Sequence, residues 1–403
     1  MKNVVLLTID ALRKDALGCY GNKSGLIPFI DSLQNKCIRF TKAHSPGPYT
    51  QAAFPGILTS SYYLEYGRQK MLSRERVLIS DALKKAGIAT AGFHSNPYLS
   101  NYFGWNRGWD VFYDSMEDQV DEKVPYIKAG EINKKVSSWL SSHTGGAVEH
   151  KPFFLWVHYM DVHEPYVPER RYIDVVDPSI KLNEEEMFRL FKDVLLKRDV
   201  ADRDAVEVLK KLYCAHVREI DEGVREFFGI LEKCNDLKDS VIIITSDHGD
   251  EFGEHGGLSH DGKMYEELVN VPLLIYEPAR ETAEVSDLLV STLDIPPTIV
   301  YLFGVNPVDA FEGHSLIPLE DHPLKGVFGE AVDKHGSKEK GEEKEVHYFL
   351  EDDLKIIYCE TDDSWELYDL KADPKELTNI INTYSAAEDL KQKIKPRVRR
   401  NQR

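Results

Sequence analysis

The chain has 403 residues, of which 42% are hydrophobic and 29% are charged, a composition typical of globular domains rather than of disordered segments. The 50 Lys and Arg residues against 68 Asp and Glu residues give a formal net charge of −18, which repels phosphate backbones and argues against a nucleic-acid-binding protein. No apolar run approaches the roughly 18 residues that a membrane-spanning helix needs, so we expect no membrane segment.

The continuous apolar run at residues 3–9 predicts a strand that is buried on both faces. Helical and extended patterns then alternate along the chain. This alternation predicts a parallel or mixed sheet with helices on both faces. Further elements are predicted as a helix over residues 80–86, strands over 88–93, 152–159, 241–245 and 271–276, and a charged helical region over about 183–234.

The character of the sequence changes near residue 325, so we divide the chain into a large domain (1–325), a small α+β subdomain (326–395) and a basic tail (396–403). Residues 334–345 hold four Lys, four Glu and two Gly, which predicts a solvated loop. A hairpin of residues 346–350 and 354–358 follows, and then a helix over about 386–394.

The five cysteines are scattered and odd in number, with no C-x-x-C pair. This pattern favours reduced thiols in a cytoplasmic protein over a disulfide framework or a zinc cluster. The apolar stretch at the N-terminus is too short for a signal peptide, and no small-residue cleavage site follows it.

Ligand-type side chains follow two of the predicted strands. Asp10 comes directly after residues 3–9, and Asp247 and His248, followed by Gly249, come after residues 241–245. Ligands collect at the carboxyl ends of strands in α/β sheets, and these oxygen and nitrogen donors suit Mn²⁺, Mg²⁺, Ca²⁺ or Zn²⁺. The simpler alternative is a pair of helix-capping aspartates and a surface histidine.

A loop rich in Pro and Gly leads to Thr50, which starts a predicted short helix. A hydroxyl in that place lies at the positive end of the helix, among free backbone N–H groups, which favours an alkoxide and an anionic substrate. The alternative is that Thr50 only caps the helix. Two further clusters of acids and histidines, at residues 158–166 and 253–267, each follow an extended run.

Together these motifs resemble those of sulfatases and, more widely, of the alkaline phosphatase superfamily. The resemblance implies an α/β fold, with a large mixed, mostly parallel sheet sandwiched by helices and a small C-terminal α+β subdomain. It covers nearly the whole chain and is carried by residues 3–13, 18–21, 45–60, 158–166, 245–256, 264–267, 271–273, 292–298, 313–319, 366–370, 373–376 and 379.

The resemblance also implies roles for single residues. Asp10, Asp247 and His248 match metal ligands, and Thr50 falls at the position of the nucleophile, which also touches the metal. His163 and His260 resemble the substrate-facing pair, which we interpret as an anion-binding group and a leaving-group acid, respectively. The remaining candidates are Arg13 and Asn96, which could reach the anion, and Asp161, which with His163 and His260 could hold a second divalent ion.

Two departures from the family pattern bear on the reaction. Sulfatases carry a Cys or Ser that becomes formylglycine, whereas Thr50 cannot be converted, and Ala11 replaces one common acidic ligand. A Thr nucleophile is instead used by phosphodiesterases and some phosphotransferases of the superfamily.

We therefore expect a metal-dependent hydrolase of phosphate esters, either diesters or monoesters, that attacks through Thr50. The alternatives are a sulfate-ester hydrolase without formylglycine and a soluble phosphotransferase. The expected partner is a small anionic ester, with no nucleic acid and no membrane, and the expected cofactor is one divalent ion or two. The oligomeric state stays open.

Overall fold

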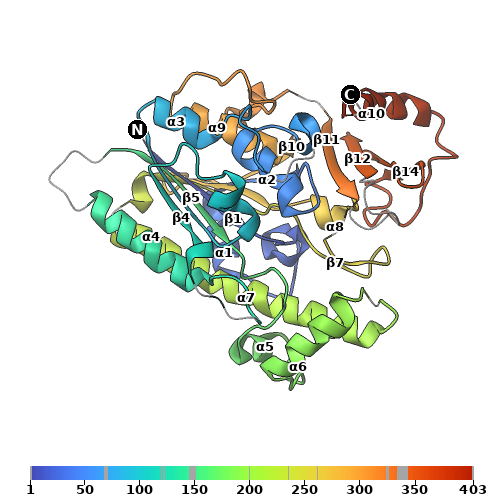
Figure 1. The fold of residues 1–403 in the computed structure, drawn as a ribbon, viewed down its shortest axis with the longest axis horizontal. Coiled ribbons are helices and arrows are strands. Elements are labelled where there is room, and N and C mark those ends of the chain that lie inside the picture. The colour runs from blue at the N-terminus through green and yellow to red at the C-terminus, as the bar shows by residue number, and fades with distance from the viewer. Residues whose placement is uncertain are drawn as a thin grey trace.

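The computed structural model describes residues 2–67, 71–118, 120, 123–144, 151–198, 200–234, 236–260, 262–323, 326–333 and 344–401. Its main sheet consists of β1 (Asn3–Ile9), β2 (Cys37–His44), β3 (Ala89–His94), β4 (Val111–Asp114), β5 (Phe153–Tyr159), β6 (Ser240–Thr245), β9 (Leu273–Tyr276) and β10 (Glu284–Ser291). The strand order is β10-β2-β9-β6-β1-β5-β3-β4 (Figure 1). β9 runs antiparallel to both of its neighbours, and the other neighbouring pairs are parallel.

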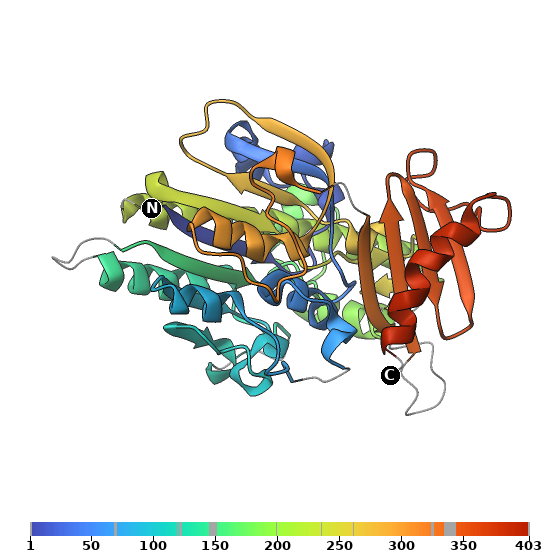
Figure 2. The same cartoon turned by 90° about the horizontal axis from the view of Figure 1, so that it is seen from above.

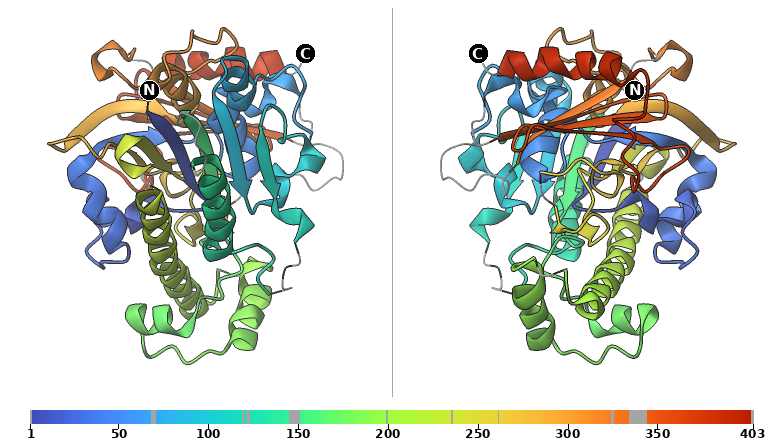
Figure 3. Two further views of the ribbon diagram at one scale, coloured as in Figure 1. Left: turned by 90° about the vertical axis from the view of Figure 1, so that its left-hand side faces the viewer. Right: turned by 90° about the vertical axis from the view of Figure 1, so that its right-hand side faces the viewer.

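Helices cover both faces of this sheet, as predicted. The described α-helices are α1 (Pro28–Leu33), α2 (Thr50–Thr59), α3 (Ile79–Lys85), α4 (Ala129–Thr144), α5 (Arg170–Val176), α6 (Glu184–Leu190), α7 (Arg203–Lys233), α8 (Glu266–Val269), α9 (Ile295–Leu302) and α10 (Ala387–Asn401). α2, α3 and α9 pack on one face, and α1, α4, α5 and α7 pack on the other. The long helices α4 and α7 run side by side beneath the sheet (Figure 3).

The central strand β1 shows why a continuous apolar run is needed. Val5, Leu7 and Ile9 belong to the core on the side of α7, whereas Val4 and Leu6 belong to the core on the side of α2. Successive side chains of a strand point to opposite faces, so a strand covered on both sides needs an apolar residue at every position. The expected fold class is confirmed.

The second sheet is antiparallel and consists of β11 (Val327–Asp333), β12 (Lys344–Glu351), β13 (Leu354–Cys359) and β14 (Ser364–Asp369), in that order. The predicted hairpin is confirmed as β12 and β13. α10 packs on this sheet and runs to Asn401, so the prediction of a tail from residue 396 is wrong as far as residue 401. Most of the expected solvated loop, residues 334–343, lies outside the described residues.

The second sheet contacts the loop that precedes α2, at the right of Figure 2. The Tyr49 hydroxyl donates to the Val332 carbonyl at 3.1 Å and accepts from the Val332 amide at 3.0 Å. The Glu330 amide donates to the Pro46 carbonyl at 2.8 Å. The loop before Thr50, which follows β2 directly, is therefore hydrogen-bonded to β11.

All five cysteines are free thiols. Among the described helices, none combines the length and the apolar composition that crossing a membrane requires.

Candidate active site

The candidate residues gather at the carboxyl ends of four adjacent parallel strands. Asp10 follows β1, and Asp247 and His248 follow β6, its neighbour in the sheet. His158 lies at the end of β5, and Asn96 follows β3. Neighbouring parallel strands end at the same edge of a sheet, so side chains far apart in sequence meet there.

Three ligand-type groups and one hydroxyl meet at the centre of this edge. His248 Nε2 lies 3.5 Å from Asp10 Oδ1 and 3.4 Å from Asp247 Oδ2. Thr50 Oγ1 lies 3.4 Å from Asp10 Oδ2 and 3.4 Å from His248 Nε2. Asp10, Asp247 and His248 are fully buried, and Thr50 is 4% exposed. The structure thus brings together the four residues that the sequence predicted around a metal ion.

The local backbone explains how these side chains converge. Ala11 takes a left-handed conformation with φ 55°, and its amide donates to Asp247 Oδ1 at 3.2 Å. His248 donates from Nδ1 to the Gly249 carbonyl at 2.9 Å, which leaves the Nε2 lone pair facing the carboxylates. Gly249 is required because a Cβ there would overlap the Glu267 carbonyl oxygen.

These residues fit a divalent cation. Asp10 Oδ1 and Asp247 Oδ2 are buried and have no hydrogen-bond partner, which is costly for a carboxylate unless a cation binds it. Burial and the charge of Asp10 raise the pKa of Asp247 above its usual value. Burial alone would raise the pKa of Asp10, but the charge of His163 and a hydrogen bond from His158 hold it well below its usual range. Two carboxylates, an imidazole and a hydroxyl match the donors that Mn²⁺, Zn²⁺, Mg²⁺ or Ca²⁺ accept.

Asn96, which we named from the sequence as a residue that could reach the anion, lies next to Asp10 and Thr50. Its side-chain nitrogen donates to Asp10 Oδ2 at 2.8 Å and lies 3.3 Å from Thr50 Oγ1. Its side-chain oxygen accepts from the Tyr98 amide at 2.9 Å, which fixes the orientation of the amide group. Asn96 therefore binds a ligand carboxylate, and it can offer an N–H group beside Thr50.

His163 and His260 lie against each other beside this centre, with ring centroids 4.9 Å apart. The ring of His260 also lies 4.4 Å from that of His248. Burial lowers the pKa of His163, but the negative charges of Asp10, Glu164 and Asp250 outweigh it and raise the pKa to about 9. Burial and the charge of His248 lower the pKa of His260 well below its usual value. In the metal-free protein the pair therefore combines a protonated imidazole with a neutral one at neutral pH.

Asp250 orients His260, and the sequence analysis missed it. Its Oδ1 accepts from His260 Nδ1 at 2.8 Å, and its Oδ2 accepts from the Tyr166 hydroxyl at 2.6 Å. The two residues flank the strands of a short hairpin, β7 (Glu251–Phe252) and β8 (Leu258–Ser259), whose pairing brings their positions together. The glycines within residues 253–257 were the sequence signal for that turn.

Arg13 and Asp161 do not join this group. The Arg13 guanidinium donates to both oxygens of Asp15, to Glu254 at 2.9 Å and to the Asp250 carbonyl at 2.7 Å. Both carboxylate oxygens of Asp161 accept from the Ala129 amide at the start of α4, at 3.0 and 3.1 Å. Arg13 thus braces the loop after β6, and Asp161 caps a helix.

A second ion at Asp161, His163 and His260 therefore lacks support from the geometry. The metal-type clusters among the described residues are Asp10–Asp247–His248, His248–Asp250–His260 and Glu251–His255–Glu267.

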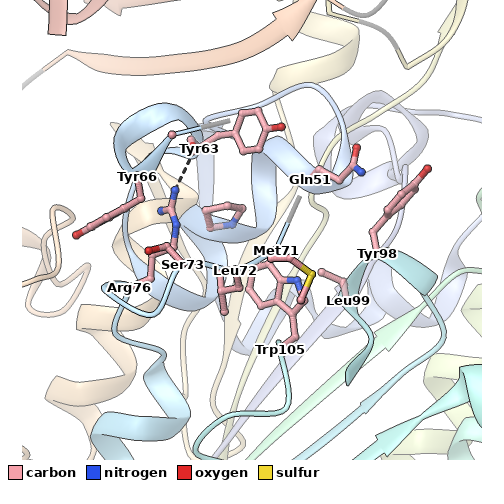
Figure 4. A pocket seen from close by; sticks show the side chains of 12 residues that line it. Gln51, Tyr63, Tyr66, Met71, Leu72, Ser73, Arg76, Tyr98, Leu99 and Trp105 are labelled. Atoms are coloured by element: carbon pink, nitrogen blue, oxygen red, sulfur yellow. Dashed lines mark hydrogen bonds between the residues drawn. The ribbon is translucent and has the colours of Figure 1, made fainter. Parts of the chain in front are cut away.

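A small cleft is lined by Gln51, the residue after Thr50 in α2 (Figure 4). Gln51, the next residue of α2, and Tyr98, which follows Asn96, form one side of it. Tyr63 and Tyr66 line the other side, and Arg76 donates to the Tyr63 carbonyl at 2.8 Å. The other lining residues are Pro55, Gly67, Met71, Leu72, Ser73, Leu99 and Trp105. The lining of this cleft is thus mixed, with aromatic and apolar side chains beside the polar groups of Gln51, Ser73 and Arg76.

Known proteins share both the sequence pattern and the fold. An arylsulfatase of Clostridium perfringens is 25% identical over 450 residues, which cover 97% of this chain and 92% of the relative. An N-acetylglucosamine-6-O-sulfatase of Bacteroides thetaiotaomicron is 23% identical over 473 residues, covering 97% and 84% of the two chains.

Solved structures show the same fold. A protein solved in complex with its substrate D-glucosamine-2-N,6-O-disulfate has a TM-score of 0.79 at 21% identity and covers 100% of this chain and 98% of its own. A phosphonate monoester hydrolase of Agrobacterium radiobacter has a TM-score of 0.73 at 18% identity and covers 99% and 95%.

Two family models match the chain. The model described as N-sulphoglucosamine sulphohydrolase, C-terminal, matches residues 253–403, and the model described as Sulfatase matches residues 2–305. Enzymes of this kind generally use a divalent metal ion, in agreement with the unpaired carboxylate oxygens at the strand ends. The chain belongs to the sulfatase family and is an ester hydrolase of the alkaline phosphatase superfamily.

Proposed function

We propose that the protein hydrolyses sulfate monoesters of small molecules and that Thr50 is the attacking group. The observation that carries the proposal is the position of Thr50 Oγ1, 3.4 Å from both Asp10 and His248 and next to two unpartnered carboxylate oxygens. The names of the relatives favour sulfate esters over the phosphate esters that we expected from the sequence.

The first chemical step follows from the groups around Thr50. After its proton has left to solvent, Thr50 Oγ attacks the sulfur, and the bond from sulfur to the leaving oxygen breaks. A divalent ion held by Asp10, Asp247 and His248 would lower the pKa of the Thr50 hydroxyl and offset the charge of the ester oxygens. The product of this step is O-sulfothreonine at residue 50.

The two histidines divide the proton transfers. His163, protonated at neutral pH, donates to the leaving oxygen, which reverses the roles that we gave to the pair from the sequence. In the second step water attacks the sulfur, the bond to Thr50 Oγ breaks, and neutral His260 accepts a proton at Nε2. Asp250 stabilises the charge that then forms on His260, because it accepts from Nδ1 at 2.8 Å. Return of the proton to His163 restores both rings.

The charge of the site favours a singly charged ester. His163 supplies a positive charge beside Thr50, whereas the Arg13 guanidinium is taken up by Asp15 and Glu254. A sulfate monoester carries one negative charge, and a phosphate monoester carries up to two.

A second candidate is the hydrolysis of phosphodiesters or phosphonate monoesters, which also carry a single charge. It is favoured by the unmodified hydroxyl of Thr50, the nucleophile that we associated with phosphodiesterases. A phosphonate monoester hydrolase is also among the proteins that share this fold.

The experiment compares 4-nitrophenyl sulfate, bis(4-nitrophenyl) phosphate and 4-nitrophenyl phosphate with one preparation of the enzyme. We expect the sulfate ester to have the highest kcat/KM and the doubly charged phosphate monoester the lowest. A highest rate with the diester would favour the second candidate. A highest rate with the phosphate monoester would contradict both.

A further inference from the structure

A chain of buried hydrogen bonds leads from the interior of the sheet to the candidate metal ligand Asp10. Trp156 Nε1 donates to Thr8 Oγ1 at 3.1 Å, and Thr8 Oγ1 lies 2.9 Å from His158 Nδ1. His158 Nε2 lies 3.2 Å from Asp10 Oδ2. All four side chains are fully buried. Neither Thr8, Trp156 nor the imidazole of His158 has a part in the mechanism above.

The register of the sheet brings this chain together. Thr8 of β1 pairs with His158 of the parallel strand β5. Trp156 lies two residues before His158, and Asp10 lies two residues after Thr8, so all four side chains lie on the same face of the sheet. The ring of His158 also meets the ring of Phe54 edge to face, with centroids 4.9 Å apart. Phe54 lies one turn after Thr50 in α2, so His158 contacts both a ligand and the helix of the nucleophile.

The first donor and the last acceptor of this chain of hydrogen bonds are fixed by their chemistry. The Trp156 indole N–H can only donate, and an ionised Asp10 carboxylate can only accept. His158 Nε2 must therefore carry a proton, which it donates to Asp10. If the ring is neutral, the Thr8 hydroxyl donates to Nδ1. If the ring is charged, Nδ1 donates to Thr8, whose own proton can go to the Val157 carbonyl at 3.3 Å.

These bonds leave the two carboxylate oxygens of Asp10 in different situations. Oδ2 accepts from His158 and, at 2.8 Å, from Asn96, so its hydrogen-bonding capacity is largely used. Oδ1 has no partner and faces His248 Nε2 at 3.5 Å. With one oxygen held by two donors, the carboxylate cannot rotate without breaking both bonds.

We propose that His158 is a positioning residue, which holds the carboxylate of Asp10 so that Oδ1 is presented to the cation. Thr8 and Trp156 in turn hold the imidazole. The inference depends on the cation site of the proposed function, but it does not depend on Thr50 as the nucleophile or on the nature of the ester.

The test measures binding of Mn²⁺ and Zn²⁺ to the metal-free protein by calorimetry, for the wild type, His158→Leu and His158→Gln. We expect His158→Leu to weaken binding about 10- to 100-fold, the usual effect of removing a group that orients a metal ligand. Gln offers an N–H close to the position of Nε2, so His158→Gln should recover most of the affinity.

The matched control is His94→Leu. His94 is fully buried and pairs in register with His158 one strand further along, and its Nε2 lies 3.9 Å from Asp114 Oδ1, which is not a candidate metal ligand. We expect this variant to lose stability but to bind Mn²⁺ within about twofold of the wild type. Equal losses in His94→Leu and His158→Leu would show a general packing effect and would overturn the proposal.

If His158→Leu does not fold, Thr8→Val provides the second variant. Valine keeps the shape of threonine but removes the hydroxyl that orients the imidazole, so metal binding should weaken several-fold while His158 is retained. Unchanged affinity in Thr8→Val, or absence of metal binding by the wild type, would overturn the proposal. A wild-type protein that binds the metal but hydrolyses none of the esters would instead count against the proposed reaction.

Discussion

Two buried clusters of acids and histidines lie close together in this protein and have opposite electrostatic character. The site cluster (Asp10, Thr50, Asp247 and His248) has two carboxylate oxygens without a partner and no Lys or Arg bound to it among the described contacts. The junction cluster (His44, Glu266, Lys355 and Glu376) joins the main sheet to the second sheet. Lys355 Nζ lies 2.9 Å from Glu266 and 2.9 Å from Glu376.

The comparison shows that the pairing of charges separates a functional cluster from a structural one. In the junction cluster, burial would lower the pKa of Lys355, but the carboxylates of Glu266 and Glu376 raise it above its usual value. The chain itself therefore neutralises these acids. In the site cluster the repulsion between Asp10 and Asp247 is left for a bound cation to neutralise.

The largest effect that would test this contrast is expected for Thr50→Ala. Removal of the attacking oxygen should lower kcat by at least about 1000-fold with little change in melting temperature, because the remaining metal and anion-binding groups give only residual catalysis. Thr50→Ser keeps the oxygen and should retain part of the rate. Mass spectrometry of an acid-quenched reaction should find the substrate-derived group on the peptide that contains Thr50. A Thr50→Ala enzyme with the activity of the wild type would contradict the covalent mechanism.

Lys355→Met should break the junction cluster. Lys355 is fully buried, so its removal leaves Glu376 without its cationic partner and Glu266 with only His44, and should cost about 3–5 kcal/mol of unfolding free energy, measured by urea denaturation. The control is Lys42→Met, which removes the exposed pair of Lys42 with Asp353 between the same two parts of the protein and should cost less than about 1 kcal/mol. Equal costs for the two variants would remove the distinction between the pairs.

Asp247→Asn should have the opposite effect on stability from Lys355→Met. Metal binding should weaken at least about tenfold, because one charged ligand is lost. The metal-free protein should be no less stable than the wild type, because the substitution also removes the repulsion between Asp247 and Asp10. Calorimetric titration with Mn²⁺ and melting of the metal-free variant provide the two measurements. A strongly destabilised metal-free variant would mean that Asp247 is paired after all.

We expect the smallest of these effects in the pH dependence of kcat/KM. His163 is protonated below its pKa of about 9, so kcat/KM should fall about tenfold per pH unit above 9. Burial raises the pKa of Asp250 to about 6, so below pH 6 it becomes protonated and no longer supports a charge on His260. We expect a plateau between these values, and His163→Gln should remove the alkaline fall. An unchanged alkaline limb in that variant would assign the proton to another group.

The sequence was sufficient to predict the strands in which a continuous apolar run is followed directly by ligand-type side chains. The apolar runs of β1 and β6 are buried on both faces, and each ends in the predicted ligands, so Asp10, Asp247 and His248 could be placed in advance. Strands such as β10 were missed because this half-exposed edge strand mixes Val and Leu with Ser, Asp and Glu and so has only a short apolar run.

Other residues could not be assigned without knowledge of the three-dimensional contacts. Asp161 has a ligand-type side chain after a strand, but the start of α4 lies next to it and takes both oxygens. The bond from His158 to Asp10 depends on strand register, which the local sequence does not determine. Arg13 is drawn away by Asp15, only two residues along the chain, in a bidentate pair.

The bonds between the loop before Thr50 and β11 also determine which part of the site can form first while the chain is synthesised. Tyr49 binds Val332, 283 residues further along the chain, and the Ser45 carbonyl accepts from the Tyr348 hydroxyl, 303 residues further along. Domains generally fold as their segments leave the ribosome, so Thr50, the proposed nucleophile, is synthesised long before the strands that hold its loop. A nascent chain that has completed the main sheet would hold all the candidate metal ligands but would not yet fix Thr50, so we expect the proposed ester hydrolysis to begin only after β11 and β12 have emerged.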